Sequence, residues 1–168
     1  MQEAVPIGKG SMLAVLGSDI NEINNYILHL KNKGVCEIAN DNAQGQVIVS
    51  GNISAVEELK DILKENKKKS ITLPVSAPFH CSLMNSAASK MKEKIENTNF
   101  KKPDHEIISN VTSQPVNNPE EFKDLLVKQI YTRVRWRETI LFMGAKKINN
   151  FIEIGPGKVL TGLVKRIL

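Results

Sequence analysis

The chain has 168 residues, of which 41% are hydrophobic and 24% charged, and its formal net charge at pH 7 is +5. This balance is typical of a soluble globular protein and argues against a disordered chain. The apolar runs are far shorter than the roughly 20 residues that a membrane-spanning helix needs, and MQEAVPIGKG lacks the apolar stretch of a secretory signal. The two cysteines, Cys36 and Cys81, lack metal-ligand spacing, which favours a reducing compartment and argues against a zinc site.

The first half of the chain predicts the element order β-α-β-β-α-β. Short apolar or alternating runs predict strands at 11–17, 35–40, 46–51 and 70–75. Apolar residues at helical spacing predict a helix over 18–34, capped by Ser18 and stopped by Gly34, and a helix over 52–68, capped by Asn52. This is the order of a ferredoxin-like unit from Met12 to Val75. Because that fold has many functions, the order alone indicates no chemistry.

The second half predicts alternating helices and strands. The helical segments are 81–97, 120–131, 136–147 and 156–168, with Asn118 and Pro119 as the cap and first residue of the second one. The predicted strands are His105–Val111 and Asn150–Gly155. Such alternation is typical of a doubly wound α/β sheet, but two strands are too few for an independent sheet.

One histidine lies at a junction that favours chemistry. His80, in LPVSAPFHCSLM, lies between a predicted strand and a predicted helix, where side chains of α/β proteins meet ligands. A neutral imidazole can act as a general base, although the residues alone favour a histidine that only packs at this junction. Cys81 is adjacent in sequence, so the two side chains diverge, and a small buried hydrophobe is the better interpretation. The chain has no G-x-S-x-G elbow.

Two further features have competing interpretations. FIEIGPGKVLTGL predicts a tight strand-to-helix turn; the helix start with Lys158 could hold an anion, but no complete phosphate motif is present. Lysine runs at 64–70 and 100–103 indicate solvated loops, or an acidic partner. Aromatic residues are only 5% and do not accompany these runs, which argues against nucleic acid binding.

Five stretches together resemble the malonyl-CoA:acyl carrier protein transacylase family. They are MQEAVPIGKGSMLAVLG, NDNAQGQVIVSG, LPVSAPFHCSLM, LLVKQIYTRVRW and IEIGPGKVLTGLVKRI, and they follow the family's order from Met1 to Leu168. The resemblance covers about the C-terminal half to two-thirds of such an enzyme. It implies an α/β fold in which residues 1–11 connect from a core half absent from this chain, 12–75 form a ferredoxin-like small subdomain, and 76–168 form the C-terminal part of an α/β-hydrolase-like core.

The resemblance also implies roles for individual residues. His80 matches the catalytic base, and Gln129 in VKQIY matches the residue whose backbone carbonyl orients it. Phe79 matches a position that narrows the acyl pocket, and Asn40 and Asn42 match polar residues near the cofactor channel. The family's serine elbow, oxyanion loop and carboxylate-binding arginine precede MQEAVP, so this chain is expected to supply the base without the nucleophile.

The implied function is acyl transfer in fatty acid synthesis. Malonyl-CoA would be the substrate and acyl carrier protein the partner, with no permanently bound cofactor, no metal, no nucleic acid and no membrane. The expected location is the cytoplasm, or an organelle if a targeting segment belongs to the missing part. Self-association through the uncovered core is also expected. The alternative function is that of a non-catalytic ferredoxin-like binding module.

Overall fold

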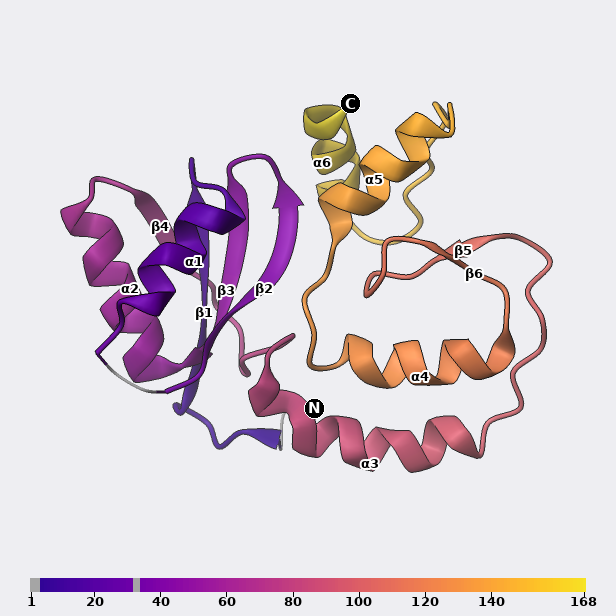
Figure 1. Ribbon diagram of the computed structural model, residues 1–168, viewed down its shortest axis with the longest axis horizontal. Coiled ribbons are helices and arrows are strands. Elements are labelled where there is room, and N and C mark those ends of the chain that lie inside the picture. The colour runs from indigo at the N-terminus through magenta and orange to yellow at the C-terminus, as the bar shows by residue number, and fades with distance from the viewer. Residues whose placement is uncertain (1–3, 32–33) are drawn as a thin grey trace.

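The computed structural model describes residues 4–31 and 34–168. A four-stranded sheet with two helices lies on one side of the molecule, and four further helices with a small two-stranded hairpin lie on the other (Figure 1). The elements are β1 (Gly10–Leu16), α1 (Ile20–Leu28), β2 (Cys36–Ala43), β3 (Gln46–Asn52), α2 (Ile53–Glu65), β4 (Lys69–Thr72), the 3-10 turn η2 (Ser82–Met84), α3 (Asn85–Glu96), β5 (Ile107–Ile108), β6 (Pro115–Val116), α4 (Pro119–Gln129), α5 (Trp136–Ala145) and α6 (Val159–Ile167).

The first four strands form one antiparallel sheet. Their spatial order is β2-β3-β1-β4, and each neighbouring pair is antiparallel. Between β2 and β3 the chain turns at Gln44 and Gly45, and Gly45 has φ +69, a left-handed conformation that glycine adopts without steric strain. The predicted β-α-β-β-α-β order is confirmed.

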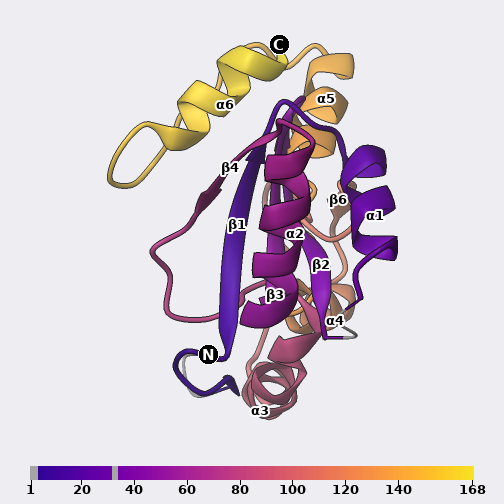
Figure 2. The same ribbon diagram turned by 90° about the vertical axis from the view of Figure 1, so that its left-hand side faces the viewer.

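The two faces of this sheet have different neighbours. One face carries the main core beneath α1 and α2, which cover it in Figure 2; its strand residues include Leu13, Val15, Val47 and Val49. The opposite face carries Met12, Ala14, Ala39 and Ile48, and here Leu73 and Phe79 pack on the sheet. The alternation of buried residues along the strands therefore places the segment with His80 against the second face.

Several boundaries in the sheet half differ from the sequence prediction. Asp19, and not Ser18, caps α1, because Asp19 Oδ1 accepts the Glu22 N–H at 2.9 Å. The helix ends at Leu28, before the predicted stop at Gly34; residues 32 and 33 lie outside the described residues. The Asn52 side chain does not cap α2 but accepts the Val35 N–H at 2.7 Å.

In the second half, one strand prediction holds only in part and the other is wrong. The predicted strand His105–Val111 is reduced to β5, which pairs only with β6. The predicted strand Asn150–Gly155 is irregular, and its Ile152 and Ile154 are 87% and 95% exposed. A strand forms only where a neighbouring backbone accepts and donates hydrogen bonds, and the described part of the chain supplies no such neighbour here. No doubly wound sheet forms within these residues.

The helices of the second half agree better with the sequence prediction than its strands do. Asn118 caps α4, with its Oδ1 accepting the Glu120 N–H at 2.9 Å, and Pro119 is the first helical residue. Helices α3 and α4 lie side by side and run antiparallel (Figure 1), around a core of Met84, Ala87, Ala88 and Ile130. The beginning of α3 therefore lies next to the end of α4. Among the described helices, none is long and apolar enough to cross a membrane.

Candidate active site

His80 lies in a sharp turn where the chain leaves the sheet and enters η2 and α3. Its φ is +59, a left-handed value that is uncommon for residues other than glycine. Such a conformation costs on the order of 1–3 kcal/mol and persists only where the surroundings impose it. The preceding Pro78 lies so close to the sheet that a Cβ at Gly10 would come within 2.4 Å of its ring.

Among residues 4–31 and 34–168, one hydrogen-bond partner of the His80 imidazole is found. His80 Nδ1 lies 3.0 Å from the backbone oxygen of Gln129. A carbonyl oxygen can only accept, so Nδ1 carries the proton and Nε2 keeps a free lone pair. Gln129 is the last residue of α4, where carbonyl groups lack intrahelical donors. The antiparallel packing of α3 against α4 thus presents a free helix-end carbonyl to the histidine.

The surroundings favour the neutral form of this histidine. Burial lowers the pKa of His80 below its ordinary value, and the hydrogen bond to the Gln129 carbonyl opposes that shift only in part. The unperturbed pKa is about 6.5, so at physiological pH the ring is neutral. An oriented, neutral imidazole with a free Nε2 has the properties of a general base.

Phe79 lies between two apolar clusters. It is half-buried and packs both on the sheet cluster that contains Ala39 and Ile48 and on the α3–α4 cluster that contains Met84. Its backbone N–H donates to Ala77 O at 3.1 Å. Phe79 therefore anchors the turn that holds His80 by packing against apolar residues of both halves of the chain.

Asn40 and Asn42 lie on β2, farther along the sheet. Both are half-buried, and Asn40 forms a parallel bridge with Val134, where Asp41 N–H donates to Val134 O at 2.9 Å. Within the described residues, neither asparagine is hydrogen-bonded to His80. The structure thus brings His80 and Gln129 into hydrogen-bond contact beside Phe79, and no described hydrogen bond joins the two asparagines to them.

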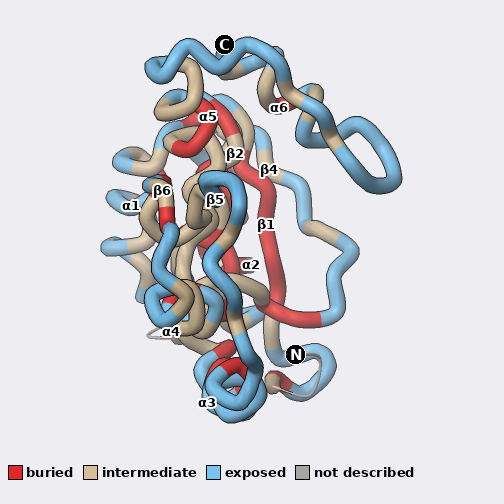
Figure 3. The backbone as a smooth tube through the Cα atoms, turned by 90° about the vertical axis from the view of Figure 1, so that its right-hand side faces the viewer, coloured by how far each residue is buried: buried red, intermediate tan, exposed pale blue. Residues whose placement is uncertain are grey.

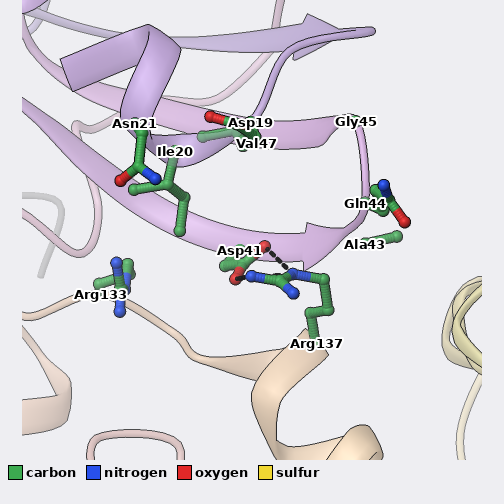
Figure 4. A pocket seen from close by; sticks show the side chains of 10 residues that line it. All are labelled: Asp19, Ile20, Asn21, Asp41, Ala43, Gln44, Gly45, Val47, Arg133 and Arg137. Atoms are coloured by element: carbon green, nitrogen blue, oxygen red, sulfur yellow. Dashed lines mark hydrogen bonds and ion pairs between the residues drawn. The ribbon is translucent and has the colours of Figure 1, made fainter. Parts of the chain in front are cut away.

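Sequence reasoning missed an ion pair beside these asparagines, in which a buried carboxylate meets a partly exposed arginine. The Asp41 side chain is 2% exposed, and Arg137 Nε lies 3.0 Å from each of its carboxylate oxygens (Figure 4). The pair lines a cleft of about 470 Å³ between α1, the β2–β3 turn and residues 133–137. Because the partners are 96 positions apart, no local pattern predicts them. The predicted strand 35–40 ends just before Asp41, so no sequence signal indicates that this carboxylate is buried.

The helix start at α6 is occupied by the chain's own carboxylate. Glu153 accepts the N–H groups of Leu160 and Thr161 at 3.1 and 2.9 Å. Gly155 and Gly157 have φ +142 and +87, which glycine permits. Residues 151–154 are not a strand and 155–158 are a bend, so the predicted tight strand-to-helix turn does not form. An external anion would have to displace Glu153 from this position.

The cysteines and nearby hydroxyls do not supply a nucleophile. Cys81 is fully buried, its Sγ donates to Pro78 O at 3.2 Å, and burial raises the pKa of its thiol. Burial also raises the pKa of Cys36 to about 12. Among the described residues, no hydroxyl or thiol is hydrogen-bonded to His80, and no cluster of three or more His, Cys, Asp or Glu side chains could hold a metal ion.

Comparison with known proteins identifies relatives along nearly the whole chain. No protein-family model matches the chain. A malonyl CoA-acyl carrier protein transacylase of Bacillus subtilis is 41% identical over 169 residues, which cover 99% of this chain and 53% of that protein. The chain thus spans about half the length of the curated relatives that it matches. The resemblance seen in the sequence motifs is confirmed.

Solved structures of similar proteins agree with this result. An acyl carrier protein S-malonyltransferase from Vibrio cholerae superposes with a TM-score of 0.96 at 38% identity, over 100% of this chain and 55% of that one. A second structure is a type II PKS acyl-carrier protein in complex with its malonyl-transacylase, with a TM-score of 0.95 at 38% identity over 99% of this chain and 54% of that one. The α/β fold of this chain is therefore that of about half of such proteins.

Proposed function

We propose that this chain is part of an acyltransferase that moves malonyl from malonyl-CoA to the phosphopantetheine thiol of acyl carrier protein in fatty acid synthesis. The observation that carries the proposal is the hydrogen bond from His80 Nδ1 to the Gln129 carbonyl, at 3.0 Å. It leaves Nε2 unprotonated in a chain that is similar over 99% of its length to a malonyl CoA-acyl carrier protein transacylase.

In this proposal His80 serves as base and then as acid in two half-reactions. Nε2 takes the proton of a serine hydroxyl as its oxygen attacks the malonyl thioester carbonyl, and the imidazolium returns that proton to the departing CoA sulfur. The carrier-protein thiol then attacks the serine ester by the reverse sequence of proton transfers. Since the printed sequence has no G-x-S-x-G elbow, we assign the serine to a part of the protein outside these 168 residues.

The neighbouring residues receive roles in substrate binding. Phe79 would limit the width of the acyl pocket, because it directly precedes His80 in the chain and its side chain packs against two apolar clusters. Asn40 and Asn42 would face the CoA or phosphopantetheine channel, at some distance from the reacting atoms. Malonyl-CoA is a substrate in this scheme, and no permanently bound cofactor is required.

Acyl carrier protein is the proposed partner. A relative with a TM-score of 0.95 is described in complex with an acyl-carrier protein, and the net charge of +5 would favour the approach of an acidic protein. The lysine runs at 64–70 and 100–103 are the basic segments available for such steering. A cytoplasmic location belongs to the same proposal.

We also propose a division of the chain that matches this function. Residues 12–75 would form a ferredoxin-like small subdomain, supported by the sheet order β2-β3-β1-β4. Residues 1–11 would connect it to the core, and residues 76–168 would be the C-terminal part of an α/β-hydrolase-like acyltransferase core. The base and its orienting carbonyl both fall in this last segment.

A chimera tests the proposal directly. The matching 53% of the Bacillus subtilis transacylase is replaced by this chain, and transfer of labelled malonyl from malonyl-CoA to acyl carrier protein is measured. We expect transfer by the chimera and a loss of about 10²–10⁴-fold on His80→Ala, the range for a general base. His29→Ala is the matched control, because His29 is exposed and its ring nitrogen also contacts a backbone oxygen.

The outcomes separate the proposal from its alternative. A folded chimera that transfers malonyl equally well without His80 would contradict the assigned base. Binding of acyl carrier protein by a folded chimera without any transfer would favour the non-catalytic module. Stable ester formation on the 168-residue chain alone would show that the nucleophile is not missing from it.

A further inference from the structure

The left-handed turn at His80 requires contacts that impose it. Residues with this backbone conformation return to favourable φ values unless neighbouring groups prevent it. The hydrogen bond to Gln129 restrains the ring but not the backbone on either side of it. The contacts that hold the residues just after His80 therefore decide where its imidazole points.

Glu37, on β2, makes the strongest of these contacts. Its Oε2 accepts the Ser82 N–H at 2.8 Å, and its Oε1 accepts the Ser82 hydroxyl at 2.6 Å. Both carboxylate oxygens are thus bound by one residue, two positions after His80. Hydrogen bonds to an ionised acceptor are roughly twice as strong as neutral ones.

Strand β3, next to β2, contacts Cys81, the residue between His80 and Ser82. Ser50 is the cross-strand partner of Glu37, and its hydroxyl donates to Cys81 Sγ at 3.6 Å. Directly opposed residues of an antiparallel pair present their side chains on the same face. The pair Glu37–Ser50 therefore contacts Ser82 and Cys81, two consecutive residues of the histidine turn.

Glu37 also supplies what the helix that follows lacks. Neither η2 nor α3 has a side-chain cap from its own N-cap residue. The first N–H groups of a helix attract negative charge, and Glu37 brings a carboxylate to Ser82, at the start of this helical stretch, from 45 residues away. The sheet thereby determines where the stretch begins.

We propose that Glu37 is a positioning residue for His80: it anchors Ser82 to the sheet and so keeps the imidazole aligned with the Gln129 carbonyl. This inference rests on the proposed function for its catalytic meaning. Its physical content is independent of that function, because it concerns the orientation and tautomer of one ring. It makes the sheet half of the chain a structural part of the active site in the other half.

Imidazole nitrogen NMR of the ¹⁵N-labelled chain tests this inference. At a pH above the histidine pKa, His80 should show a protonated Nδ1 and an unprotonated Nε2, assigned by its loss in His80→Gln. Glu37→Ala should convert this pattern to the tautomer mixture of a free imidazole. Glu37→Gln should retain it in part, since a carboxamide oxygen can still accept the Ser82 N–H.

Two further variants keep the test decisive. Glu57→Ala is the matched control, because Glu57 is a half-exposed glutamate on α2 and should leave the His80 signals unchanged. If Glu37→Ala does not fold, Ser82→Ala takes its place; it removes one of the two hydrogen bonds and should produce an intermediate pattern. A folded Glu37→Ala, or failing that a folded Ser82→Ala, with an unchanged Nδ1–H pattern would overturn the inference.

The result can be separated from the test of the proposed function. Suppose the chimera lacks malonyl transfer, while NMR of the 168-residue chain shows that the His80 tautomer depends on Glu37. This pair of results would contradict the proposed function but support the positioning role of Glu37. Malonyl transfer together with an unchanged tautomer in Glu37→Ala would contradict the positioning role alone.

Discussion

At the scale of single residues, the chemistry depends on what the His80 ring donates to. Many catalytic histidines donate to a carboxylate, which orients the ring and also stabilises its charged form. Here the acceptor is the Gln129 carbonyl, which orients the ring but carries no net charge. Burial then outweighs the hydrogen bond and lowers the pKa of His80. The ring is thus kept in its neutral form rather than as an imidazolium.

The first prediction concerns the titration of this ring. The NMR midpoint of His80 should lie below the ordinary value of about 6.5. Because the folded-state pKa is the lower one, the unfolded chain binds more protons between the two values. The free energy of unfolding should therefore fall as the pH drops from 6.5 through the folded-state pKa. His80→Gln should remove this dependence, whereas a midpoint above 6.5 would contradict it.

At the scale of elements, helix α4 is predicted from local sequence signals, and its last residue forms part of the candidate site. Asn118 and Pro119 predict its start, and the structure places its last residue, Gln129, against His80. The sequence alone could predict that α4 exists, because capping and periodicity are local. It could not predict that the Gln129 carbonyl meets the histidine, since this depends on the antiparallel packing of α3 and α4.

The second prediction concerns the cap of that helix. Asn118→Ala removes the acceptor for the Glu120 N–H and should lower the free energy of unfolding by about 1 kcal/mol, as measured by urea denaturation. Asn118→Asp keeps the oxygen acceptor and should cause no such loss. Equal stability of the alanine variant and the parent would show that this cap contributes nothing.

The strand predictions that are wrong or too long have two physical causes. Alternating apolar residues at 150–155 favour a strand, but the described chain offers no backbone to pair with them, and Ile154 stays 95% exposed. Strand β4 ends at Thr72, two residues before Pro74, which has no N–H to donate. Pairing partners lie outside any sequence window, whereas cap and periodicity signals lie inside it.

At the scale of the whole molecule, polar contacts join the sheet half to the helical half, among them the main-chain bridge between Asn40 and Val134. The Asp41–Arg137 pair links β2 to α5, and Glu37–Ser82 links β2 to η2. Figure 3 shows that the chain around α6 is mostly exposed while β1 is buried. The sheet half has its own apolar core, so these links orient the two halves.

The third prediction concerns the first of these links. Arg137→Ala leaves the Asp41 carboxylate, 2% exposed, without its cation, and should lower the free energy of unfolding by roughly 3 kcal/mol. The double variant Asp41→Ala, Arg137→Ala should be less destabilised than Arg137→Ala, because no unpaired charge remains. With Asp41→Ala measured alone to complete the double-mutant cycle, additive losses would show that the pair is not coupled.

The fourth prediction concerns the exposed apolar side chains. Ile152, Ile154 and Val159 are 87%, 95% and 72% exposed, and such surfaces favour association. We expect the chain to self-associate in sedimentation experiments at micromolar concentration, and the association to weaken in Ile154→Lys. A chain that sediments as a monomer at all concentrations would contradict this expectation.

The most direct test of the central claim is the rate at which malonyl ester forms on the chimera in a single turnover, followed by quenched-flow mass spectrometry across pH. If His80 is the base, the rate should rise with pH along one ionisation whose midpoint lies below about 6.5, and it should fall by about 10²–10⁴-fold in His80→Ala. An ester that forms at the full rate without His80, in a folded chimera, would contradict the account.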